Sequence, residues 1–361
     1  MPLIEAFALF QGGSVPFAGT DPQIVTITIE GSDVLAKVSV SQGSTDSLKD
    51  GSDTILFLTL PSTSPSNAQV IGLDAVVIAS SDVNPVGAIT LDQMRSVLNG
   101  SITNWKDLGS GDSAITVHVA DGDAGFQAKV KALGLEPTAS AFVTQHARMK
   151  DLAYAVENDP FGVTVVPFSG LRTARAMELR GACGMHNEAK IFKVQSGSYS
   201  LNFALSVSKP NKRLPIFAWE FLEFLETEQA QAVIADLGFG DLGIRTRELD
   251  SQGQRLANSV MIIGKEVREM MTIMSGAQLL SLTFRFEAGS TRLDGPSKEN
   301  AEALVAGMIL GNYADKVVYL MGFSDGDGRA RQNKALPKDR AEAVRAELIK
   351  AVPEGVLAQR A

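Results

Sequence analysis

The chain has 361 residues, of which 45% are hydrophobic and 20% are charged, and its formal net charge is −8. This length favours two domains over a single core. The composition is typical of a globular protein and excludes a disordered or fibrous chain. The acidic balance argues against a nucleic-acid partner, which requires a basic surface. No apolar run approaches the ~20 residues that span a bilayer, so we expect no transmembrane segment.

The residues that most often carry catalysis or bind metals are few. The single cysteine, Cys183, excludes an internal disulfide, and with only three histidines it argues against a structural zinc site. His118, His146 and His186 are scattered, and we expect His118 to be a hydrogen-bonded residue of a strand. No nucleophile elbow, HExxH pair or phosphate-binding loop motif is present. We therefore expect a protein that is not an enzyme and has no cofactor or metal.

The first two thirds of the chain alternate strands with helices. An amphipathic helix is predicted over residues 1–12. Apolar, β-branched runs predict strands at residues 24–29, 34–40, 55–60, 70–79, 115–119, 162–167 and 200–207. Helices are predicted before Gly51, from Thr90, from Ala124, and over residues 147–158 and 215–237. The alternation predicts an α/β domain with mostly parallel sheets.

The most informative passage of this part runs from Asn84 to Gly109. Thr90 is a predicted helix cap, Gly100 a predicted helix end, and Trp105 an anchor for the turn that follows. The predicted helix has one apolar face, made of Leu91, Met94, Val97 and Leu98.

The last third has a different organisation. Residues 248–279 include a Met-rich stripe at helical spacing, which predicts a packed helical connection between domains. Residues 280–361 then predict a small β-α-β-α unit, with strands at 282–286 and 316–321 and helices at 297–310 and 338–351. A final strand near residues 355–358 is a further possibility.

An acid and a base stand out in this C-terminal part. Asp325 lies on a Gly-rich turn after an apolar strand, and Arg340 lies at the predicted start of an Ala-rich helix. A carboxylate and a guanidinium held at a fixed separation could bind the ammonium and the carboxylate of a small zwitterion. The alternative is a structural ion pair.

Residues 280–350 resemble the outer-membrane protein A-like peptidoglycan-binding domain. The matching stretches are Thr283–Leu293, the GFSDGDG turn, and Asn333–Val344. Two positions depart from that family, because Phe323 stands where it often has His and Pro337 replaces the Ser that caps its last helix. Since proline is tolerated in a first helical turn, we expect the helix to form.

This resemblance implies a β-α-β-α-β fold that binds the diaminopimelate of the peptidoglycan stem peptide. It implies that Asp325 binds the ammonium group and Arg340 the carboxylate, with assistance from Asn333. Ser324 and Gly326 would supply backbone donors on the turn.

Residues 1–245 resemble the substrate-binding protein of phosphate ABC transporters. The matching stretches are Asn84–Gly109, Pro160–Leu171, Gln195–Pro210 and Trp219–Phe239. The resemblance implies a two-lobed α/β fold of the type II periplasmic-binding class. In that family a strand and a Gly-Ser-x-Thr loop precede the first helix. We therefore interpret the chain as one trimmed of that strand and loop.

In that family hydroxyls and backbone amides at helix starts bind phosphate, as the physics of helix N-termini favours. The resemblance places such a site at Gly43, Ser44, Thr45 and Gly125. The family's Arg-x-x-x-Ser-Gly-Thr is absent before Gly125, and two carboxylates stand there instead.

Those carboxylates are Asp121 and Asp123, which would repel a phosphate dianion unless one of them accepts its remaining proton. We expect Ser196, Ser198 and Tyr199 to be structural.

Three segments follow from these interpretations: a substrate-binding domain over residues 1–247, a helical connection over 248–279, and a peptidoglycan-binding domain over 280–361. The predicted protein is a periplasmic, cell-wall-attached binding protein of a Gram-negative bacterium, associated with the wall or outer membrane, whose N-terminal domain is a solute-binding or scaffold module. The alternative is a capture component for phosphate or another oxyanion, tethered to the wall, with an ABC transporter permease as its partner.

Overall fold

The structure is a computed structural model in which two compact units, Met1–Gly243 and Ile244–Ala361, are each described by themselves. The described residues are 24–28, 37–42, 54–59, 68–120, 124–138, 142–181, 186–208, 216–248, 277–286, 290–293, 295–313, 316–320 and 330–352. Outside them lie the predicted helices at 1–12, before Gly51 and within 249–274, the strand near 355–358, and Cys183. The helical connection predicted over 248–279 is wrong at its two described ends, because Glu248 ends one strand and residues 278–280 form another, and the two strands pair with each other.

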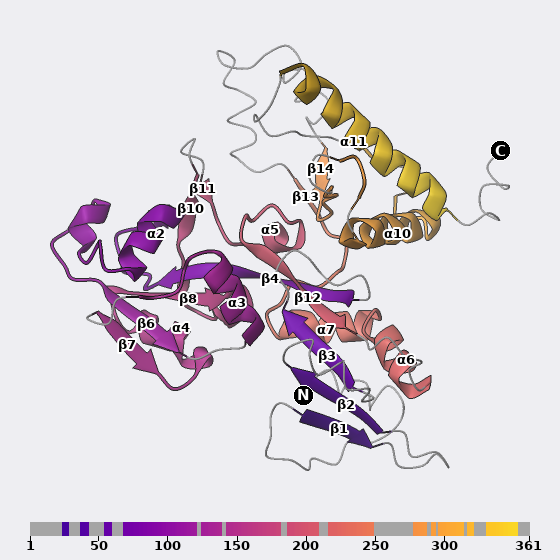
Figure 1. Ribbon diagram of the computed structural model, residues 1–361. Helices are drawn as coiled ribbons and strands as arrows, with labels where there is room; N and C mark the ends of the chain where they lie inside the picture. Colours follow the sequence, from indigo (N-terminus) through magenta and orange to yellow (C-terminus); the bar gives the residue numbers. More distant parts are fainter. Residues whose placement is uncertain are drawn as a thin grey trace. The chain divides into compact units, whose positions relative to one another are not determined.

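The first unit is built on a nine-stranded sheet in which one long strand, β4 (Ala68–Ser80), belongs to both halves (Figure 1). The strand order is β1 (Ile24–Thr28), β2 (Lys37–Gln42), β3 (Thr54–Thr59), β12 (Asn202–Ser208), β4, β8 (Gly162–Pro167), β6 (Thr116–Ala120) and β7 (Val143–His146). The short strand β9 (Arg175–Ala176) also pairs with β4. These strands confirm the predicted strand positions to within a few residues.

The predicted sheet type is wrong, because the large sheet is mixed. Only the pairs β2–β3, β6–β7 and β6–β8 are parallel, and the other pairs are antiparallel. Strand β4 accounts for three of the five antiparallel pairs, since it runs antiparallel to its neighbours β8, β9 and β12, and the other two are β1–β2 and β3–β12. A smaller sheet in the order β11 (His186–Asn187), β10 (Glu178–Arg180) and β5 (Ala88–Ile89) completes the strands of this unit among the described residues.

Strand directions in the two halves of the sheet converge on one point of β4. The pairing of β4 passes from β12 to β8 between Ala75, opposite Asn202, and Val76, opposite Pro167. Pro167 is the carboxyl end of β8, to which β6 is parallel, and β7 is parallel to β6. Asn202 is the amino end of β12, which runs antiparallel to β3, and β3 is parallel to β2. The carboxyl ends of β2, β3, β6, β7 and β8 therefore all point toward this crossing point.

The helices of the first unit pack on the sheet through buried apolar side chains. They are α2 (Leu91–Leu98), α3 (Ala124–Ala132), α4 (Leu152–Glu157), α5 (Ile191–Gln195), α6 (Ile216–Phe224) and α7 (Glu228–Asp236), with 3-10 turns η2 (Trp105–Leu108), η3 (Met149–Asp151) and η4 (Phe168–Gly170). Phe126 of α3 packs in one core with Val117, while Val156 of α4 packs in another with Ala120. Because side chains alternate along β6, helices α3 and α4 cover opposite faces of the sheet.

One predicted helix is wrong in length. The helix predicted over residues 215–237 is two helices, α6 and α7, that are separated at residues 225–227. Thr227 causes the break: its hydroxyl donates to the carbonyl of Phe224 over 2.7 Å and accepts from the amide of Ala230 over 3.3 Å. A threonine side chain at this position ends one helix and caps the next.

The second unit contains β13 (Thr246–Glu248), β14 (Gln278–Leu280), α10 (Gly295–Ile309) and α11 (Ala330–Ala351) among its described residues. Helix α10 confirms the predicted helix over 297–310. Residues 282–285 have no regular secondary structure, Phe286 forms only an isolated bridge with Leu293, and residues 316–320 form no strand. The two strands predicted there are therefore not formed as sheet strands in the part of the unit that the structure describes.

Helix α11 begins eight residues earlier than predicted, at Ala330. Good helix formers such as Ala330, Lys334 and Leu336 precede the proline, so the helix extends through it. Pro337 consequently lies inside the helix, where it supplies no backbone donor, and not in the first turn as predicted. Arg340 lies in the middle of α11, whereas the prediction placed it at the helix start.

The cap of α2 is confirmed in detail and gives a first prediction. Thr90 Oγ1 accepts from the amide of Gln93 over 3.1 Å, and Gln93 Oε1 accepts from the amide of Thr90 over 3.0 Å. Replacing Thr90 by Ala leaves a helix amide without its side-chain acceptor, so the free energy of unfolding should fall by about 1 kcal/mol in urea denaturation. Thr173→Ala, at an exposed turn, is the control, and an equal loss for both variants would contradict this role of Thr90.

Candidate functional site

The predicted anion-binding residues follow, in the chain, strands whose carboxyl ends point toward the β4 crossing point. Gly43, Ser44 and Thr45 directly follow the carboxyl end of β2, and Gly125 lies in the first turn of α3, which follows β6. In α/β sheets ligands bind beyond the carboxyl ends of strands, near the point where the strand order reverses. Gly43, Ser44, Thr45, Asp121 and Asp123 lie outside the described residues, so their side-chain geometry stays a prediction.

Asp74 is the most deeply buried charged residue at this crossing point. Asp74 precedes Ala75, the last residue of β4 that pairs with β12, and it is 1% exposed. Oδ1 accepts from the amides of Ala75 (2.7 Å) and Ser169 (3.1 Å), and Oδ2 accepts from the Ser169 hydroxyl (2.7 Å). The carboxylate therefore fixes η4, at the end of β8, to the middle of β4.

Burial raises the pKa of Asp74 to about 6, although the hydrogen bonds from Ser169, Ala75 and Phe168 act in the opposite direction. Ionisation of this carboxyl in the folded protein is thus unfavourable compared with the unfolded chain. The ionised carboxyl therefore costs stability, while its hydrogen bonds hold η4 against β4.

The turn at residues 238–241 closes the other side of the crossing point. Leu73 and Gly240 exchange two backbone hydrogen bonds of 2.7 Å each. Gly238 has φ +90°, and a Cβ there would lie 2.9 Å from the carbonyl oxygen of Ser169. The buried side chain of Gln195 donates to Asp241 Oδ2 over 3.0 Å. Glycine at position 238 is required both by the backbone conformation and by close approach to η4.

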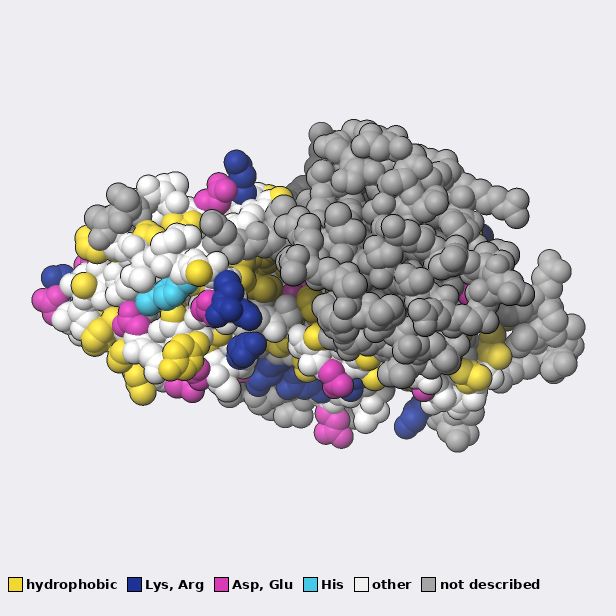
Figure 2. Space-filling view, turned by 90° about the horizontal axis from the view of Figure 1, so that it is seen from below, with side chains coloured by type: hydrophobic (Ala, Val, Ile, Leu, Met, Phe, Trp, Pro, Cys, Tyr) yellow, Lys and Arg dark blue, Asp and Glu magenta, His cyan; other side chains and the backbone are white. Residues whose placement is uncertain are grey.

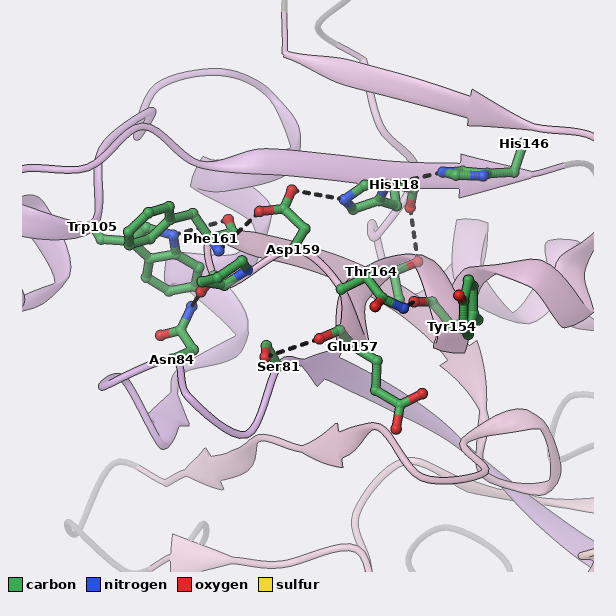
Figure 3. A network of polar contacts seen from close by, with 12 residues as sticks. Ser81, Asn84, Trp105, His118, His146, Tyr154, Glu157, Asp159, Phe161 and Thr164 are labelled. Atoms are coloured by element: carbon green, nitrogen blue, oxygen red, sulfur yellow. Dashed lines mark hydrogen bonds and ion pairs between the residues drawn. The ribbon is translucent and has the colours of Figure 1, made fainter.

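A second polar network lies on the α4 face of the sheet, where His118, His146 and Asp159 form a chain of contacts (Figure 3). His118 Nε2 is 3.0 Å from Asp159 Oδ2, and His118 Nδ1 is 2.9 Å from His146 Nε2. The His118 carbonyl also accepts from the Thr164 hydroxyl over 2.7 Å. His118 is 7% exposed, so the prediction that it is a hydrogen-bonded strand residue is confirmed.

The carboxylate of this network is held in its ionised form. Partial burial acts to raise the pKa of Asp159, but hydrogen bonds from His118, the Phe161 amide and Thr116 outweigh it and lower the pKa below its ordinary value. The Phe161 carbonyl accepts from Trp105 Nε1 over 3.0 Å, which confirms Trp105 as a buried anchor.

Basic side chains gather on one face of the described surface. Figure 2, which views the molecule of Figure 1 from below, shows this group near the middle of the picture, with acidic side chains beside it.

Among the described residues no three His, Cys, Asp or Glu side chains are arranged to hold a metal ion. The described helices also include none that is long and apolar enough to cross a membrane.

In the second unit the structure describes one of the two predicted clamp residues. Arg340 is half-buried on α11, and its guanidinium carbon lies 5.1 Å from the centre of the Phe286 ring. Asn333 lies in the first turn of α11. Ser324, Asp325 and Gly326 lie outside the described residues, so the pairing of Asp325 with Arg340 stays a prediction.

Sequence reasoning missed three features of these sites. It treated the histidines as scattered, whereas His118 and His146 are in contact because β6 and β7 are adjacent parallel strands. It gave no role to Asp74, although an acid in the middle of an apolar strand is a signal that could have been used. It also did not connect Phe286 with Arg340, which are 54 positions apart (340 − 286).

Comparison with known proteins agrees with the fold of the first unit. Residues 63–208 match a family model described as a PBP superfamily domain. The N-terminal part of the chain thus has a periplasmic-binding-protein-like α/β fold.

Within that class the N-terminal part resembles the phosphate-binding proteins. It is 27% identical over 169 residues to phosphate-binding protein PstS of Bacillus subtilis, a match covering 46% of this chain and 55% of the relative. It is 24% identical over 244 residues to PstS of Borreliella burgdorferi, covering 65% of this chain and 78% of the relative. The chain thus spans only about half the length of the first of these proteins.

A solved ABC-type phosphate transport receptor from Vibrio cholerae is 19% identical, with a TM-score of 0.46, and the match covers 54% of this chain and 82% of that chain. The matched relatives are named as binding proteins, not enzymes. The matching family model stops before the second unit, and the peptidoglycan-binding resemblance of that unit stays a prediction.

The buried Asp74 gives a prediction about pH. A carboxyl whose pKa is raised on folding contributes stability that is complete below its unfolded pKa, about 4, and is lost as pH rises through about 6. The free energy of unfolding should therefore gain up to about 3 kcal/mol in Asp74→Asn relative to the native chain between pH 4 and pH 7. Urea denaturation across this pH range measures the difference.

The control for this measurement is Asp236→Asn, at an exposed position of α7. Asparagine keeps the acceptor for the amides of Ala75 and Ser169, and the Ser169 hydroxyl can turn to accept from its amide group. If the curves for Asp74→Asn and the native chain stay parallel over the whole range, the assigned cost of ionising Asp74 is wrong.

Proposed function

We propose that the first unit is the solute-capture component of an ABC transporter and binds phosphate or another oxyanion in the periplasm. The observation that supports this most directly is the convergence of strand ends at the β4 crossing point in a chain whose N-terminal part matches the PBP superfamily and phosphate-binding proteins. In this proposal the anion binds beyond the carboxyl ends of β2 and β6, and the residues that follow these strands in the chain bind it.

The proposed ligand groups are backbone amides and hydroxyls. Ser44 and Thr45 follow β2, and Gly125 in the first turn of α3 leaves a helix amide open to close approach by an oxyanion. Phosphate bound in this way is held without a fixed cation. The nearby carboxylates are accommodated if Asp121 or Asp123 accepts the remaining proton of the phosphate in a hydrogen bond.

This arrangement makes a prediction for the intact chain. Ser44→Ala and Thr45→Ala should each weaken phosphate binding about ten- to hundredfold in isothermal titration calorimetry, because each removes one hydrogen bond to a charged ligand. Sulfate, which carries no proton at neutral pH, should bind more weakly than phosphate, and Asp123→Asn or Asp121→Asn should reduce this discrimination.

Thr173→Ala, which removes a hydroxyl from an exposed turn, is the matched control and should bind phosphate as the native chain does. If the native chain shows no heat with phosphate, arsenate, molybdate or sulfate, the capture function fails. The first unit would then be a scaffold that retains the fold of a solute-binding protein.

A second function is favoured by one observation in the second unit. Arg340 is held on α11 over the Phe286 ring, within the stretch that resembles the peptidoglycan-binding domain. We propose that this unit attaches the protein to the cell wall of a Gram-negative bacterium. Arg340 would bind the carboxylate of diaminopimelate and Asp325 its ammonium group, with Asn333, Ser324 and Gly326 completing the site.

Sedimentation with purified peptidoglycan tests this attachment. Asp325→Ala and Arg340→Ala should each reduce the sedimenting fraction of the full chain to background, because each removes the charged partner of one end of the zwitterion. Circular dichroism must show that each variant is folded, since removing one member of a buried ion pair can itself destabilise a protein.

Arg345→Ala is the matched control, because Arg345 lies on the same helix, is exposed, and pairs only with its helical neighbour Glu342 at 3.6 Å among the contacts described. It should sediment as the native chain does. Normal sedimentation of both Asp325→Ala and Arg340→Ala would remove these residues from the site.

A further inference from the structure

We propose that Phe286 is a positioning residue for Arg340: its ring orients the guanidinium for the carboxylate of a diamino acid. This inference rests on the proposed wall attachment of the second unit. The direct observation is the placement of the Arg340 guanidinium carbon 5.1 Å from the centre of the Phe286 ring. This distance lies within the range of a cation–π interaction.

The ring is fixed by the backbone that carries it. Phe286 forms a bridge with Leu293, which is 5% exposed. One residue earlier, the amide of Arg285 donates to the Ser297 hydroxyl of α10 over 2.7 Å. The Asn300 side chain, also on α10, donates to the carbonyl of Thr283 over 3.0 Å. The segment 283–286 is thus attached to the first two turns of α10, and its last residue is the aromatic one.

The arginine is fixed from the other side by helix packing. Val344, one helical turn after Arg340, is 4% exposed, and residues four apart lie on the same face of a helix. Helix α11 contacts α10, whose Leu304 and Val305 are buried. The face of α11 that carries Arg340 is therefore the packed face, and the side chain extends from it to the ring.

A contact with the face of an aromatic ring leaves the chemistry of the guanidinium intact. A guanidinium that stacks on a ring does so through its flat face, whereas its five N–H donors lie in its plane. A carboxylate binds to two of these donors at the edge. Phe286 can therefore reduce the orientations of Arg340 without competing for its donors, which favours a planar anion of fixed direction. The ligand class is a diamino acid whose side chain ends in a carboxylate, such as diaminopimelate.

The experiment uses the full chain and two kinds of purified peptidoglycan, one with diaminopimelate and one with lysine at the same position of the stem peptide. Phe286→Leu should weaken binding to the diaminopimelate type about two- to thirtyfold. Binding to the lysine type, which lacks the carboxylate that Arg340 would bind, should not change. Phe286→Tyr keeps the ring face and should bind as the native chain does.

Phe284→Leu removes an aromatic ring from the same segment and controls for loss of packing. Circular dichroism and thermal unfolding accompany each variant, and Phe286→Met is the second apolar variant if the leucine variant does not fold. Three outcomes overturn the inference: unchanged binding by folded Phe286→Leu or Phe286→Met, equal losses for the apolar variants and Phe286→Tyr, or equal losses on both types of peptidoglycan.

The first of these outcomes, combined with loss of binding by Arg340→Ala, would leave the wall attachment standing without a role for Phe286. Normal binding by Arg340→Ala and Asp325→Ala would instead show that the proposed site itself is wrong. The failure of the inference and the failure of the proposed function are thus distinguishable in the same series of proteins.

Discussion

The geometry of the first unit depends on the continuous backbone of β4, which hydrogen-bonds to β12 in one half of the sheet and to β8 in the other. A single strand shared in this way sets the relative direction of all its neighbours. Close backbone approach surrounds the crossing point: a Cβ on Gly72 would lie 3.1 Å from Ile234 Cγ2 and 3.2 Å from the carbonyl oxygen of Gly240. Asp74 adds a buried carboxylate that ties η4 to the same strand. Its hydrogen bonds fix the position of η4 relative to β4, although burial of a carboxylate is unfavourable.

This constraint separates the scaffold from the residues that would bind a ligand. The scaffold fixes where the strands end, and the loops beyond those ends can vary without disturbing it. The first unit can therefore keep a periplasmic-binding-protein-like fold whichever residues precede α3, where the sequence has the carboxylates Asp121 and Asp123. Its ligand has to be argued from the loop residues, because the fold alone supports many ligands. In the second unit the residue pattern around Arg340 says more about function than the fold does, because few of the predicted strands are formed among the described residues.

Local signals predicted the parts of the fold that local interactions determine. The capping box at Thr90, the buried Trp105 and the apolar runs of β3, β4 and β8 are visible in the sequence because each depends on neighbours in the chain or on burial alone. The mixed sheet was not predictable in this way, since the direction of β4 follows from partners more than 80 residues away. The early start of α11 was missed because the proline was given too much weight. The contacts of His118 with His146 and of Phe286 with Arg340 required the packing of separate elements.

The chain from Asp159 through His118 to His146 gives two hydrogen bonds a common direction. A carboxylate can only accept, so the neutral His118 ring donates from Nε2 to Asp159, and its Nδ1 is then the acceptor for an N–H of His146. The carboxylate thus determines the tautomer of the ring that it contacts, and that ring determines which nitrogen of His146 must carry hydrogen. A side chain of β7 therefore has its donor atom selected by an acid on the far side of β6's histidine, through two hydrogen bonds and without a contact of its own.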